Sequence, residues 1–522
     1  QIMSRILALH DSHNASICEI NNDNIVYFQE AERLNKIKKS SDWSILLKKY
    51  QNKVFDKIIF VHTVLENREH FANIVKNILF LENIKYSQFI VEYNHHFFHA
   101  CSAFFNSGFK NSYVLTIDGN GSHGFSEPPL VTSEIVSLYY FNKNSFKEIF
   151  KVFQSDHDFV KNKHVFLNTQ SLGNMYSIIK RLLNFKEEGS IMGLSSYVKD
   201  ENPFTTLFVK NKFNHFSNIQ SSLFDLCGNY LEKIKKNPQF ICKIIQTELE
   251  KIVLNYVSNV LKNKKRNICV SGGVFQNTVL NSKILDICPN LYVDPFADDS
   301  GLSMGAAIWY SKKNNFKKIN NLYLGDMPNY NNLPKNKGIT TTPKQVAKFI
   351  SEGNIVAIYQ GRNEMGKRAL GNRSFLFDPR NQYAKDKINL LKNREWFRPT
   401  AGTVLHEYAK EWFDLKSKEE TPFMSYVFKV KKQGVPGITH VDNTCRMQTL
   451  KKEQNFHYYN LINEFYKLTN VPILLNTSFN LAGEPLVNSI FDAIKTLTNC
   501  DEKFKVIYFP EIGKIYKTND FL

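Results

Sequence analysis

The stretch YVLTIDGNG (residues 113–121) joins a run of apolar and β-branched residues to an aspartate and two glycines. Such a run is typical of a buried strand, and the glycines after it allow the backbone to turn sharply. NICVSGGVFQN (residues 267–277) repeats this plan. Further strand-like runs, RILALH (5–10) and KIIFVH (57–62), alternate with longer helical patterns in the first half of the chain. This alternation predicts an α/β fold.

The length of the chain indicates more than one domain. Its 522 residues exceed what one hydrophobic core usually supports. A polar stretch rich in Asn, Lys and Pro, from about residue 311 to 344, is typical of an interdomain connection. Beyond it, TPKQVAKFISEG (342–353) predicts a helix that leads into the apolar strand NIVAIYQG. We therefore place one domain at residues 3–335 and a second at residues 336–522.

The composition predicts a cytoplasmic protein. No run of eighteen uncharged apolar residues is present, so we expect no contact with a membrane. The first residues lack a secretory pattern, and we expect Met3 to be the native start. The eight cysteines are scattered and include no C-x-x-C pair, which is typical of reduced thiols and not of a disulfide framework or a zinc ribbon.

The chain is strongly basic, with 67 Lys and Arg residues against 49 Asp and Glu residues and a net charge of +18. A coding bias towards Lys, Asn, Ile and Phe is one explanation, although such a bias should enrich Glu as well. Attraction to a polyanion such as nucleic acid is the other explanation. Composition alone leaves both open.

Three histidines lie in the apolar segment HHFFHA, and two of them are spaced for one helix face. His95 and His99 stand four residues apart, a spacing that can give a divalent metal two imidazole ligands or form a structural pair. A metal needs further ligands, for which Asp118 and Asp299 are candidates, with Asp298 as a competitor. Two imidazoles and two carboxylates suit Fe(II), Mn(II) or Zn(II). A metalloprotease is excluded because no Glu follows the first histidine.

Glycines and arginines indicate binding of small anions. The glycine turns after the two strands, with EEGSIMGLSS (187–196), can close amide groups on phosphate oxygens, although ordinary tight turns have the same composition. Six of the twelve arginines lie between Arg362 and Arg398, where only two Asp and two Glu occur. Arginine binds phosphate and carboxylate oxygens in pairs, so this span predicts a small-anion pocket. The later segment NTSFN adds amide and hydroxyl groups that can orient a urea-like ligand.

Taken together, these motifs resemble the NodU/CmcH carbamoyltransferase family over nearly the whole chain. The matching segments, in order, are HNAS with EAERL, HHFFHACSAFF, LTIDGNG, EEGSIMGLSSY, SGGVFQN, DDSGLSMGAA, GRNEMGKRALGNRSFLFDPR, NREWFRPTAGTVL and NTSFNLAGEPLV. The resemblance implies an α/β protein with an N-terminal domain of the ASKHA (sugar kinase/actin-like) type and a YrdC-like α/β C-terminal domain.

The resemblance also implies a reaction. The YrdC-like domain binds carbamoyl phosphate and releases phosphate. The carbamate then meets ATP in the first domain, which gives carbamoyl-adenylate and pyrophosphate, and the carbamoyl group passes to an acceptor hydroxyl. The implied cofactors are ATP with Mg, carbamoyl phosphate as co-substrate, and a divalent metal that we expect to be Fe(II) or Mn(II).

Site residues follow from the resemblance by motif. The expected metal ligands are His95, His99, Asp118 and Asp299. The expected nucleotide-binding residues are Gly119, Gly121, Gly272, Gly273 and Asn277. The expected carbamoyl-phosphate-binding residues are Lys367, Arg368, Arg373, Lys392, Arg394, Arg398, Asn476 and Ser478. Asp11 and His13 are similar to the acceptor-side residues and are expected to act as a general base; a metal second shell or a strand-end cap is the alternative.

Two positions depart from the pattern of the family. Lys367 stands where a proline often precedes RALG, which makes the expected pocket more cationic. Ser190 replaces a frequent lysine, which removes one expected contact on the nucleotide side.

The basic charge guides the expectation for the acceptor. Phosphate contacts dominate nucleic-acid affinity, so the leading expected acceptor is a hydroxymethylated pyrimidine, 5-hydroxymethylcytosine, in DNA. The base would be single-stranded or flipped out of the duplex. The alternatives are a small-molecule sugar or antibiotic acceptor, a modification enzyme of the tRNA threonylcarbamoyladenosine type, and a non-enzymatic nucleotide sensor.

Overall fold

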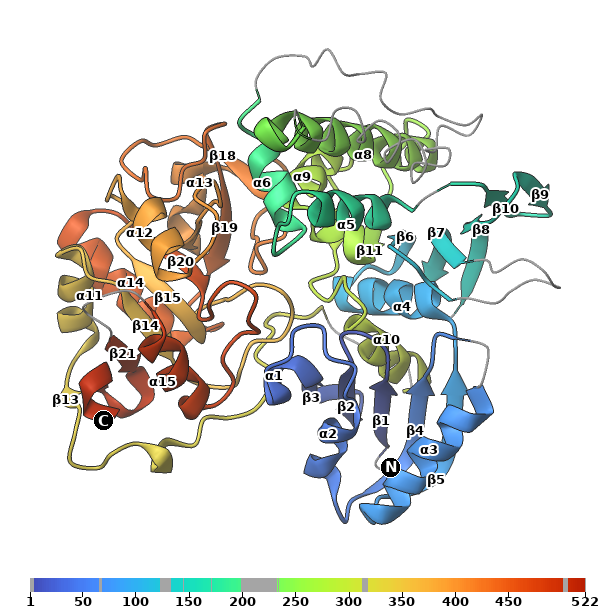
Figure 1. The fold of residues 1–522 in the computed structure, drawn as a ribbon, viewed down its shortest axis with the longest axis horizontal. Helices are drawn as coiled ribbons and strands as arrows, with labels where there is room; N and C mark the ends of the chain where they lie inside the picture. Colours follow the sequence, from blue (N-terminus) through green and yellow to red (C-terminus); the bar gives the residue numbers. More distant parts are fainter. Residues whose placement is uncertain are drawn as a thin grey trace. The chain divides into compact units, whose positions relative to one another are not determined.

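The computed structural model divides into two compact units, each with an α/β fold (Figure 1). Unit 1 comprises Gln1–Asn35 and Lys39–Ile319, and unit 2 comprises Lys36–Lys38 and Asn320–Leu522. The structure describes residues 4–64, 68–122, 133–143, 145–169, 171–198, 232, 234–311, 318–500 and 506–521. Within these ranges every helix is too short or too polar to cross a bilayer.

Unit 1 opens with a five-stranded sheet in the order β3-β2-β1-β4-β5. Its strands are β1 (Arg5–His10), β2 (Ser16–Asn21), β3 (Asn24–Glu30), β4 (Val54–Val61) and β5 (Lys85–Glu92). Strands β1 to β3 form an antiparallel meander, whereas β1, β4 and β5 run parallel. The carboxyl ends of β1 and β4 therefore meet at one edge of the sheet, where His10 is paired with Val61. The helices in this half are α1 (Ala31–Asn35), α2 (Ser44–Leu47) and α3 (Arg68–Leu81).

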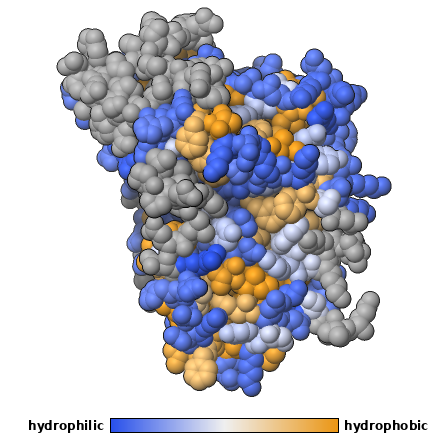
Figure 2. All heavy atoms as spheres, turned by 90° about the vertical axis from the view of Figure 1, so that its right-hand side faces the viewer, coloured by the Kyte–Doolittle hydropathy of each residue, from blue (hydrophilic) through white to orange (hydrophobic). Residues whose placement is uncertain are grey.

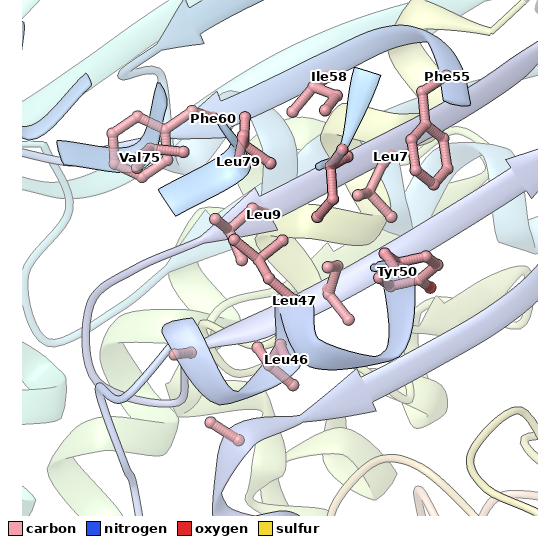
Figure 3. Packing of buried hydrophobic residues seen from close by; sticks show 14 of the residues in the cluster. Leu7, Leu9, Leu46, Leu47, Tyr50, Phe55, Ile58, Phe60, Val75 and Leu79 are labelled. Atoms are coloured by element: carbon pink, nitrogen blue, oxygen red, sulfur yellow. The ribbon is translucent and has the colours of Figure 1, made fainter. Parts of the chain in front are cut away.

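Alternating apolar residues of this sheet form one hydrophobic core with α2 and α3 (Figure 3). The side chains of a strand alternate between the two faces, so every second residue of β1 and β4 points to the same side. Each such Leu, Ile or Phe stabilises the fold by about 1.5–3 kcal/mol when it is fully buried. The central members are Leu7, Leu9, Leu46, Leu47, Tyr50, Phe55, Ile58, Phe60, Val75 and Leu79.

A seven-stranded sheet in the order β12-β11-β6-β7-β8-β10-β9 follows in unit 1. Its strands are β6 (Asn111–Ile117), β7 (Ser133–Asn142), β8 (Phe146–Gln154), β9 (Phe159–Lys161), β10 (His164–Leu167), β11 (Ile268–Ser271) and β12 (Leu291–Val293). Its helices are α4 (His95–Ser107), α5 (Leu172–Leu182), α6 (Gly189–Ser195), α8 (Pro238–Leu261), α9 (Thr278–Ile287) and α10 (Gly301–Tyr310). Every residue of α4 is buried. Helix α10 can pack closely against α4 because Gly305 has no side chain: a Cβ there would lie only 1.9 Å from the carbonyl oxygen of Phe98.

Unit 2 is built on a ten-stranded mixed sheet in the order β13-β22-β21-β14-β15-β20-β16-β19-β18-β17. Its strands are β13 (Ile339–Thr340), β14 (Val356–Tyr359), β15 (Arg373–Phe377), β16 (Ala401–Leu405), β17 (Phe413–Asp414), β18 (Val427–Val430), β19 (Thr444–Leu450), β20 (Ile473–Ser478), β21 (Val506–Phe509) and β22 (Lys514–Lys517). Its helices are α11 (Pro343–Ser351), α12 (Ala384–Leu391), α13 (Ala409–Trp412), α14 (Phe456–Thr469) and α15 (Ile490–Thr498). The α/β class predicted for both parts of the chain is thus confirmed.

Short 3₁₀ helices complete both units. They are η1 (Lys48–Tyr50), η2 (Gly273–Gln276), η4 (Tyr330–Asn332), η5 (His406–Tyr408), η6 (Pro510–Ile512) and η7 (Thr518–Phe521).

The start of unit 2 differs from the domain boundary expected between residues 335 and 336. The segment from residue 320 onwards already belongs to unit 2. Within it, Leu322 and Leu324 are buried although their neighbours in the sequence are polar. The amide of Met365 donates to the carbonyl of Leu322 at 2.9 Å, and Arg362 Nε donates to that of Gly325 at the same distance. Backbone contacts of this kind leave no signature in the composition of the segment.

The surface that bears α3 and β5 combines hydrophilic residues with apolar patches (Figure 2). Phe80 and Leu81, at the end of α3, are 83% and 76% exposed. Isolated exposed apolar residues are common on soluble proteins and need no partner to explain them.

A buried ion pair joins β7 to β8. Lys151 Nζ donates to Glu134 Oε1 and lies 3.5 Å from Glu148 Oε2. Burial alone would raise the pKa of Glu134, but the Lys151 ammonium outweighs it and lowers the pKa to about 2. Because the folded pKa is depressed, the stabilisation is complete above the ordinary value of 4.5 and is lost as the pH falls from 4.5 towards 2.

Lys151→Met is expected to destabilise the protein by about 3–5 kcal/mol, because it leaves the Glu134 carboxylate buried without its partner. The control is Lys163→Met, which removes a half-exposed lysine 2.8 Å from Glu148 and should cost about 0–1 kcal/mol. Urea unfolding followed by circular dichroism measures both variants. Equal unfolding midpoints would contradict the role given to the Glu134–Lys151 pair.

Candidate functional site

Four buried side chains of unit 1 converge on one point. They are His95 and His99 on α4, Asp118 directly after β6, and Asp299 shortly before α10, and one ligand atom of each lies within 4.8 Å of all the others. Asp118 Oδ2 is 3.3 Å from His95 Nε2 and 3.2 Å from His99 Nε2. The structure thus brings together the four residues that the resemblance assigned to a metal.

Local structure explains this convergence. The spacing of His95 and His99 places both rings on one face of α4. Asp299 Oδ1 lies 3.5 Å and 3.7 Å from their Nε2 atoms. Asp298 is used differently: its Oδ1 accepts from the amide of Ser300 at 3.2 Å and its Oδ2 from Asn14 at 3.3 Å. The geometry therefore favours Asp299 over the adjacent Asp298, a choice that spacing could not make.

Strong electrostatic coupling marks the cluster. Burial lowers the pKa of His95, but the carboxylates of Asp299 and Asp118 outweigh burial and raise the pKa to about 10. Burial and the charge of Asp299 raise the pKa of Asp118, and the hydrogen bonds from His95 and His99 outweigh both and lower it. Two ionised carboxylates facing two imidazoles form a donor set in which a divalent cation can replace the imidazole protons.

A second layer of side chains orients His99. His99 Nδ1 lies 3.4 Å from Ser271 Oγ, and that hydroxyl donates to Asp294 Oδ2 at 2.9 Å. Since the Ser271 proton is used by Asp294, Nδ1 of His99 donates to the hydroxyl. Nε2 is then the ring atom that faces the cluster, where a metal ion can replace its proton. Burial raises the pKa of Asp294 to about 6. Neither Ser271 nor Asp294 was predicted as a site residue. Ser271 lies at the end of a predicted strand, whereas Asp294 follows β12, which was not predicted.

Glycines allow the strand ends to approach Asp118. A Cβ at Gly272, which has φ +99°, would lie 2.3 Å from the carbonyl oxygen of Ile117. A Cβ at Gly273 would lie 2.9 Å from Asp118 Oδ1. The turn after β11 can therefore pack against the end of β6 only with glycine at these positions.

The glycine at the start of α5 allows this helix to pack against the residues that follow Asp118. A Cβ at Gly173 would lie 2.7 Å from the Cα atom of Gly119, and a Cβ at Gly121 would lie 2.9 Å from the ring of His96. Helix α5 begins with Ser171 as its N-cap. Backbone amides and a helix N-terminus beside a metal-type cluster suit the phosphates of a nucleotide. The sequence analysis did not identify Gly173.

Asn277 has a structural role at a position where a nucleotide contact was expected. Its Oδ1 accepts from the amide of Leu280 at 3.0 Å and from Gln246 Nε2 at 3.3 Å. Its Nδ2 donates to Gln246 Oε1 at 2.8 Å and to the Tyr176 hydroxyl at 3.1 Å. These bonds use the full capacity of the side-chain amide. A nucleotide contact by Asn277 stays a prediction.

Asp11 and His13, which were expected to act as one pair, have different partners. Asp11 Oδ2 accepts from His62 Nδ1 at 2.7 Å. His13 Nε2 lies 3.1 Å from Asp299 Oδ2, and the His13 side chain is 60% exposed. His13 therefore lies beside a carboxylate of the metal-type cluster, and its role as part of a general base stays a prediction.

Unit 2 contains a group of arginines around β19. Burial lowers the pKa of the Arg446 guanidinium, and the charges of Arg368, Arg394 and Arg398 lower it further. Positive charges gathered in this way are typical of a place where an anion binds. Three of the four were expected from the sequence. Arg446 was missed because it stands outside the arginine-rich span.

The sheet positions amide groups beside Arg446. Ala401 on β16 is paired with Arg446 on one side and with Asn476 on the other, so the three side chains share a face. Asn476 Nδ2 donates to the Thr403 hydroxyl at 3.0 Å.

Lys392 and Ser478 are also brought together. Lys392 is buried, and its Nζ donates to the Ser478 hydroxyl at 2.9 Å and to Asn480 Oδ1 at 3.0 Å. Arg373 differs from the other expected pocket residues, since its guanidinium donates to the carbonyls of Gln360, Gly361 and Asn372. It also lies 3.8 Å above the Tyr359 ring. These contacts give Arg373 a role in holding the loop after β14.

The structure describes both residues that depart from the pattern of the family. Lys367 is half-buried, and Ser190 is buried in the first turn of α6.

The chain is similar to known proteins in both sequence and structure. The model of the carbamoyltransferase N-terminus matches residues 13–308, and that of the carbamoyltransferase C-terminus matches residues 347–509. The chain is 33% identical over 539 residues to the uncharacterized protein MJ1051 of Methanocaldococcus jannaschii, covering 95% of this chain and 97% of that protein. It is 32% identical over 450 residues to the nodulation protein NolO of Bradyrhizobium diazoefficiens, covering 78% and 76%.

Among solved structures, full-length HypF in its phosphate- and nucleotide-bound form is similar to this chain with a TM-score of 0.40 and 12% identity. The alignment covers 59% of this chain and 56% of HypF. A likeness at this level carries no argument about function.

Proposed function

This chain belongs to the carbamoyltransferase family, and from this premise we propose that it takes a carbamoyl group from carbamoyl phosphate and activates it with ATP. The observation that carries the proposal is the cluster of His95, His99, Asp118 and Asp299 surrounded by glycine turns in unit 1. The arginine group of unit 2 supports it, because carbamoyl phosphate is a small dianion.

In unit 2, the guanidinium groups of Arg398 and Arg446 would hold the phosphate, and Asn476 would orient the planar carbamoyl group. Hydrolysis of carbamoyl phosphate gives carbamate and phosphate. The positive charge around Arg446 favours the binding of an anionic ligand.

In unit 1, the carbamate oxygen attacks the α-phosphate of ATP, so that pyrophosphate leaves and carbamoyl-adenylate remains. The amides beside Gly119 and Gly273 would bind phosphate oxygens. His95, His99, Asp118 and Asp299 fit a divalent metal such as Fe(II) or Mn(II), because they offer two imidazole nitrogens and two carboxylates at mutual ligand distance. When bound, such a metal supplies positive charge against the nucleotide phosphates.

We also propose an acceptor, a hydroxymethylated pyrimidine in DNA. The net charge of +18 supports it, since phosphate contacts dominate DNA affinity. Two exposed aromatic rings of unit 2 lie beside lysines and suit base stacking. Lys385 Nζ is 5.8 Å from the centre of the Trp396 ring, and Lys452 Nζ is 5.6 Å from that of Phe456. The two rings belong to residues that are 62% and 54% exposed.

Transfer of a ¹⁴C-carbamoyl group tests this acceptor. The protein is incubated with labelled carbamoyl phosphate, ATP and matched oligonucleotides that contain 5-hydroxymethylcytosine or cytosine. Label is expected on the hydroxymethylated strand alone, and more on single strands than on duplexes. Absence of label on DNA with continued consumption of carbamoyl phosphate and ATP would contradict the DNA acceptor and favour a sugar hydroxyl.

The threonylcarbamoyl alternative makes a different prediction. An enzyme of that type would not consume free carbamoyl phosphate, whereas this chain is expected to require it. Consumption of ATP that is independent of carbamoyl phosphate would favour this alternative.

A further inference from the structure

We propose that His62 is a positioning residue for the carbamoyl-transfer step, in which it holds one oxygen of Asp11 so that the other oxygen can take the proton of the acceptor hydroxyl. This inference rests on the proposed function. It adds a residue that lies outside the segments quoted for the family resemblance, and it replaces the expected Asp11–His13 pair by an Asp11–His62 pair.

The sheet topology creates this contact. β1 and β4 are parallel neighbours whose last paired residues are His10 and Val61. Asp11 and His62 are the next residues along each strand, so they emerge side by side at the carboxyl edge of the sheet. Ligands of α/β proteins bind at this edge.

The ring of His62 is fixed from several sides. Its amide donates to the carbonyl of Glu92 at 2.8 Å, which ties it to β5. Its ring stacks between Phe60, at 5.7 Å between ring centres, and Phe71, at 4.6 Å. Only 7% of the His62 side chain is exposed. A ring held in this way has one orientation available for its hydrogen bond to Asp11.

The protonation of the pair follows from its geometry. Asp11 Oδ2 lies 2.7 Å from His62 Nδ1, and a carboxylate can only accept, so Nδ1 carries the proton. The neighbouring His10 is buried and kept neutral, because burial lowers its pKa to about 4. His10 Nδ1 faces the carbonyl of Val61 at 3.3 Å and its Nε2 faces Ser12, so it does not compete for Asp11.

Asp11 retains one unused oxygen. Oδ1 is buried and has no hydrogen-bond partner among the residues that the structure describes. A buried carboxylate oxygen without a partner is costly and calls for an explanation. Two residues further on, His13 contacts Asp299 of the metal-type cluster, so this oxygen is close in the chain to the proposed adenylate site.

The transfer step balances with Asp11 as the base. The acceptor O–H bond breaks, and its electron pair forms the new bond to the carbamoyl carbon. The bond from this carbon to the AMP phosphate oxygen breaks, and AMP leaves with that electron pair. The proton goes to Asp11 Oδ1, while the hydrogen bond from His62 keeps Oδ2 in place.

Substitution of His62 tests whether this residue positions Asp11 for the transfer step or only stabilises the fold. His62→Leu removes the donor and keeps an apolar side chain between the two Phe rings. It should lower kcat for transfer to the 5-hydroxymethylcytosine oligonucleotide about 100-fold, with KM and carbamoyl-phosphate-dependent pyrophosphate release unchanged. His62→Asn retains an N–H near the position of Nδ1 and should recover most of the lost kcat. His70→Leu, an exposed histidine whose ring centre lies 5.9 Å from that of Phe71, is the control.

A spectroscopic measurement tests the pair without any acceptor. In ¹H NMR, the Nδ1 proton of His62 should resonate far downfield and should vanish in both His62→Leu and Asp11→Asn. Absence of this resonance in the wild type, or its persistence in Asp11→Asn, would contradict the pair. Transfer by His62→Leu at the wild-type rate, or an equal loss of pyrophosphate release and transfer, would also overturn the inference. Failure of the wild type to release pyrophosphate would instead overturn the proposed function.

Discussion

His99→Ala is expected to yield a protein that no longer retains a divalent metal and has lost carbamoyl transfer by at least about a thousandfold. His99 supplies one of the four buried ligand atoms, and alanine offers none in its place. The remaining His95 and two carboxylates would keep an incomplete donor set around a cavity. Metal content by mass spectrometry and transfer of ¹⁴C-carbamoyl measure the two effects.

Two further variants test whether the loss of metal is specific to His99. Ser271→Ala leaves all four ligands but removes the hydroxyl that orients His99, so metal affinity should fall about 10- to 100-fold. His70→Ala removes an exposed histidine of α3 and should change nothing. Unchanged metal content in His99→Ala would refute the role of this residue as a ligand.

Arg446→Met is expected to raise KM for carbamoyl phosphate by roughly 30- to several-thousand-fold, the effect of about 2–5 kcal/mol for removing one partner of a buried charge pair. The same change should leave the protein without ligand equally stable or more stable. The reason is that the half-buried Arg446 lies near the like charges of Arg368, Arg394 and Arg398. Opposite effects on binding and on stability distinguish a ligand-binding arginine from a structural one.

Arg380→Met is the matched control. Arg380 is paired with Asp378, at 2.6 Å from Nη2 to Oδ2, so its loss should leave KM unchanged. Steady-state kinetics and thermal unfolding without ligand measure both variants. A large loss of stability in Arg446→Met with unchanged KM would contradict its place in the pocket.

The four residues of the metal-type cluster lie on motifs that can be read from the sequence, and the family resemblance joined them into one set. The spacing of His95 and His99 gives two ligands from one helix, and the strand before Asp118 predicts its position at a sheet edge. Asp298 and Asp299 are adjacent in the turn before α10, so the sequence does not tell which of the two side chains faces the histidines. Only the hydrogen bonds from Asn14 and Ser300 to Asp298 decide it.

Other features could not be predicted because they depend on strands distant in sequence. Arg446 reaches the arginine group through the pairing of β16 with β19, and composition gives no hint of that register. His62 meets Asp11 only because β4 lies beside β1. Arg373 carries the same motif signal as its neighbours, yet its guanidinium binds backbone carbonyls.

The central claim is that carbamoyl phosphate and ATP react on this chain to give an adenylate, and the fate of the nucleotide tests it most directly. The wild-type protein is incubated with ATP labelled at the α-phosphate, with and without carbamoyl phosphate. Labelled AMP and an equal amount of pyrophosphate should form only when carbamoyl phosphate is present. Formation of ADP and phosphate, or nucleotide consumption that does not change when carbamoyl phosphate is omitted, would contradict the account.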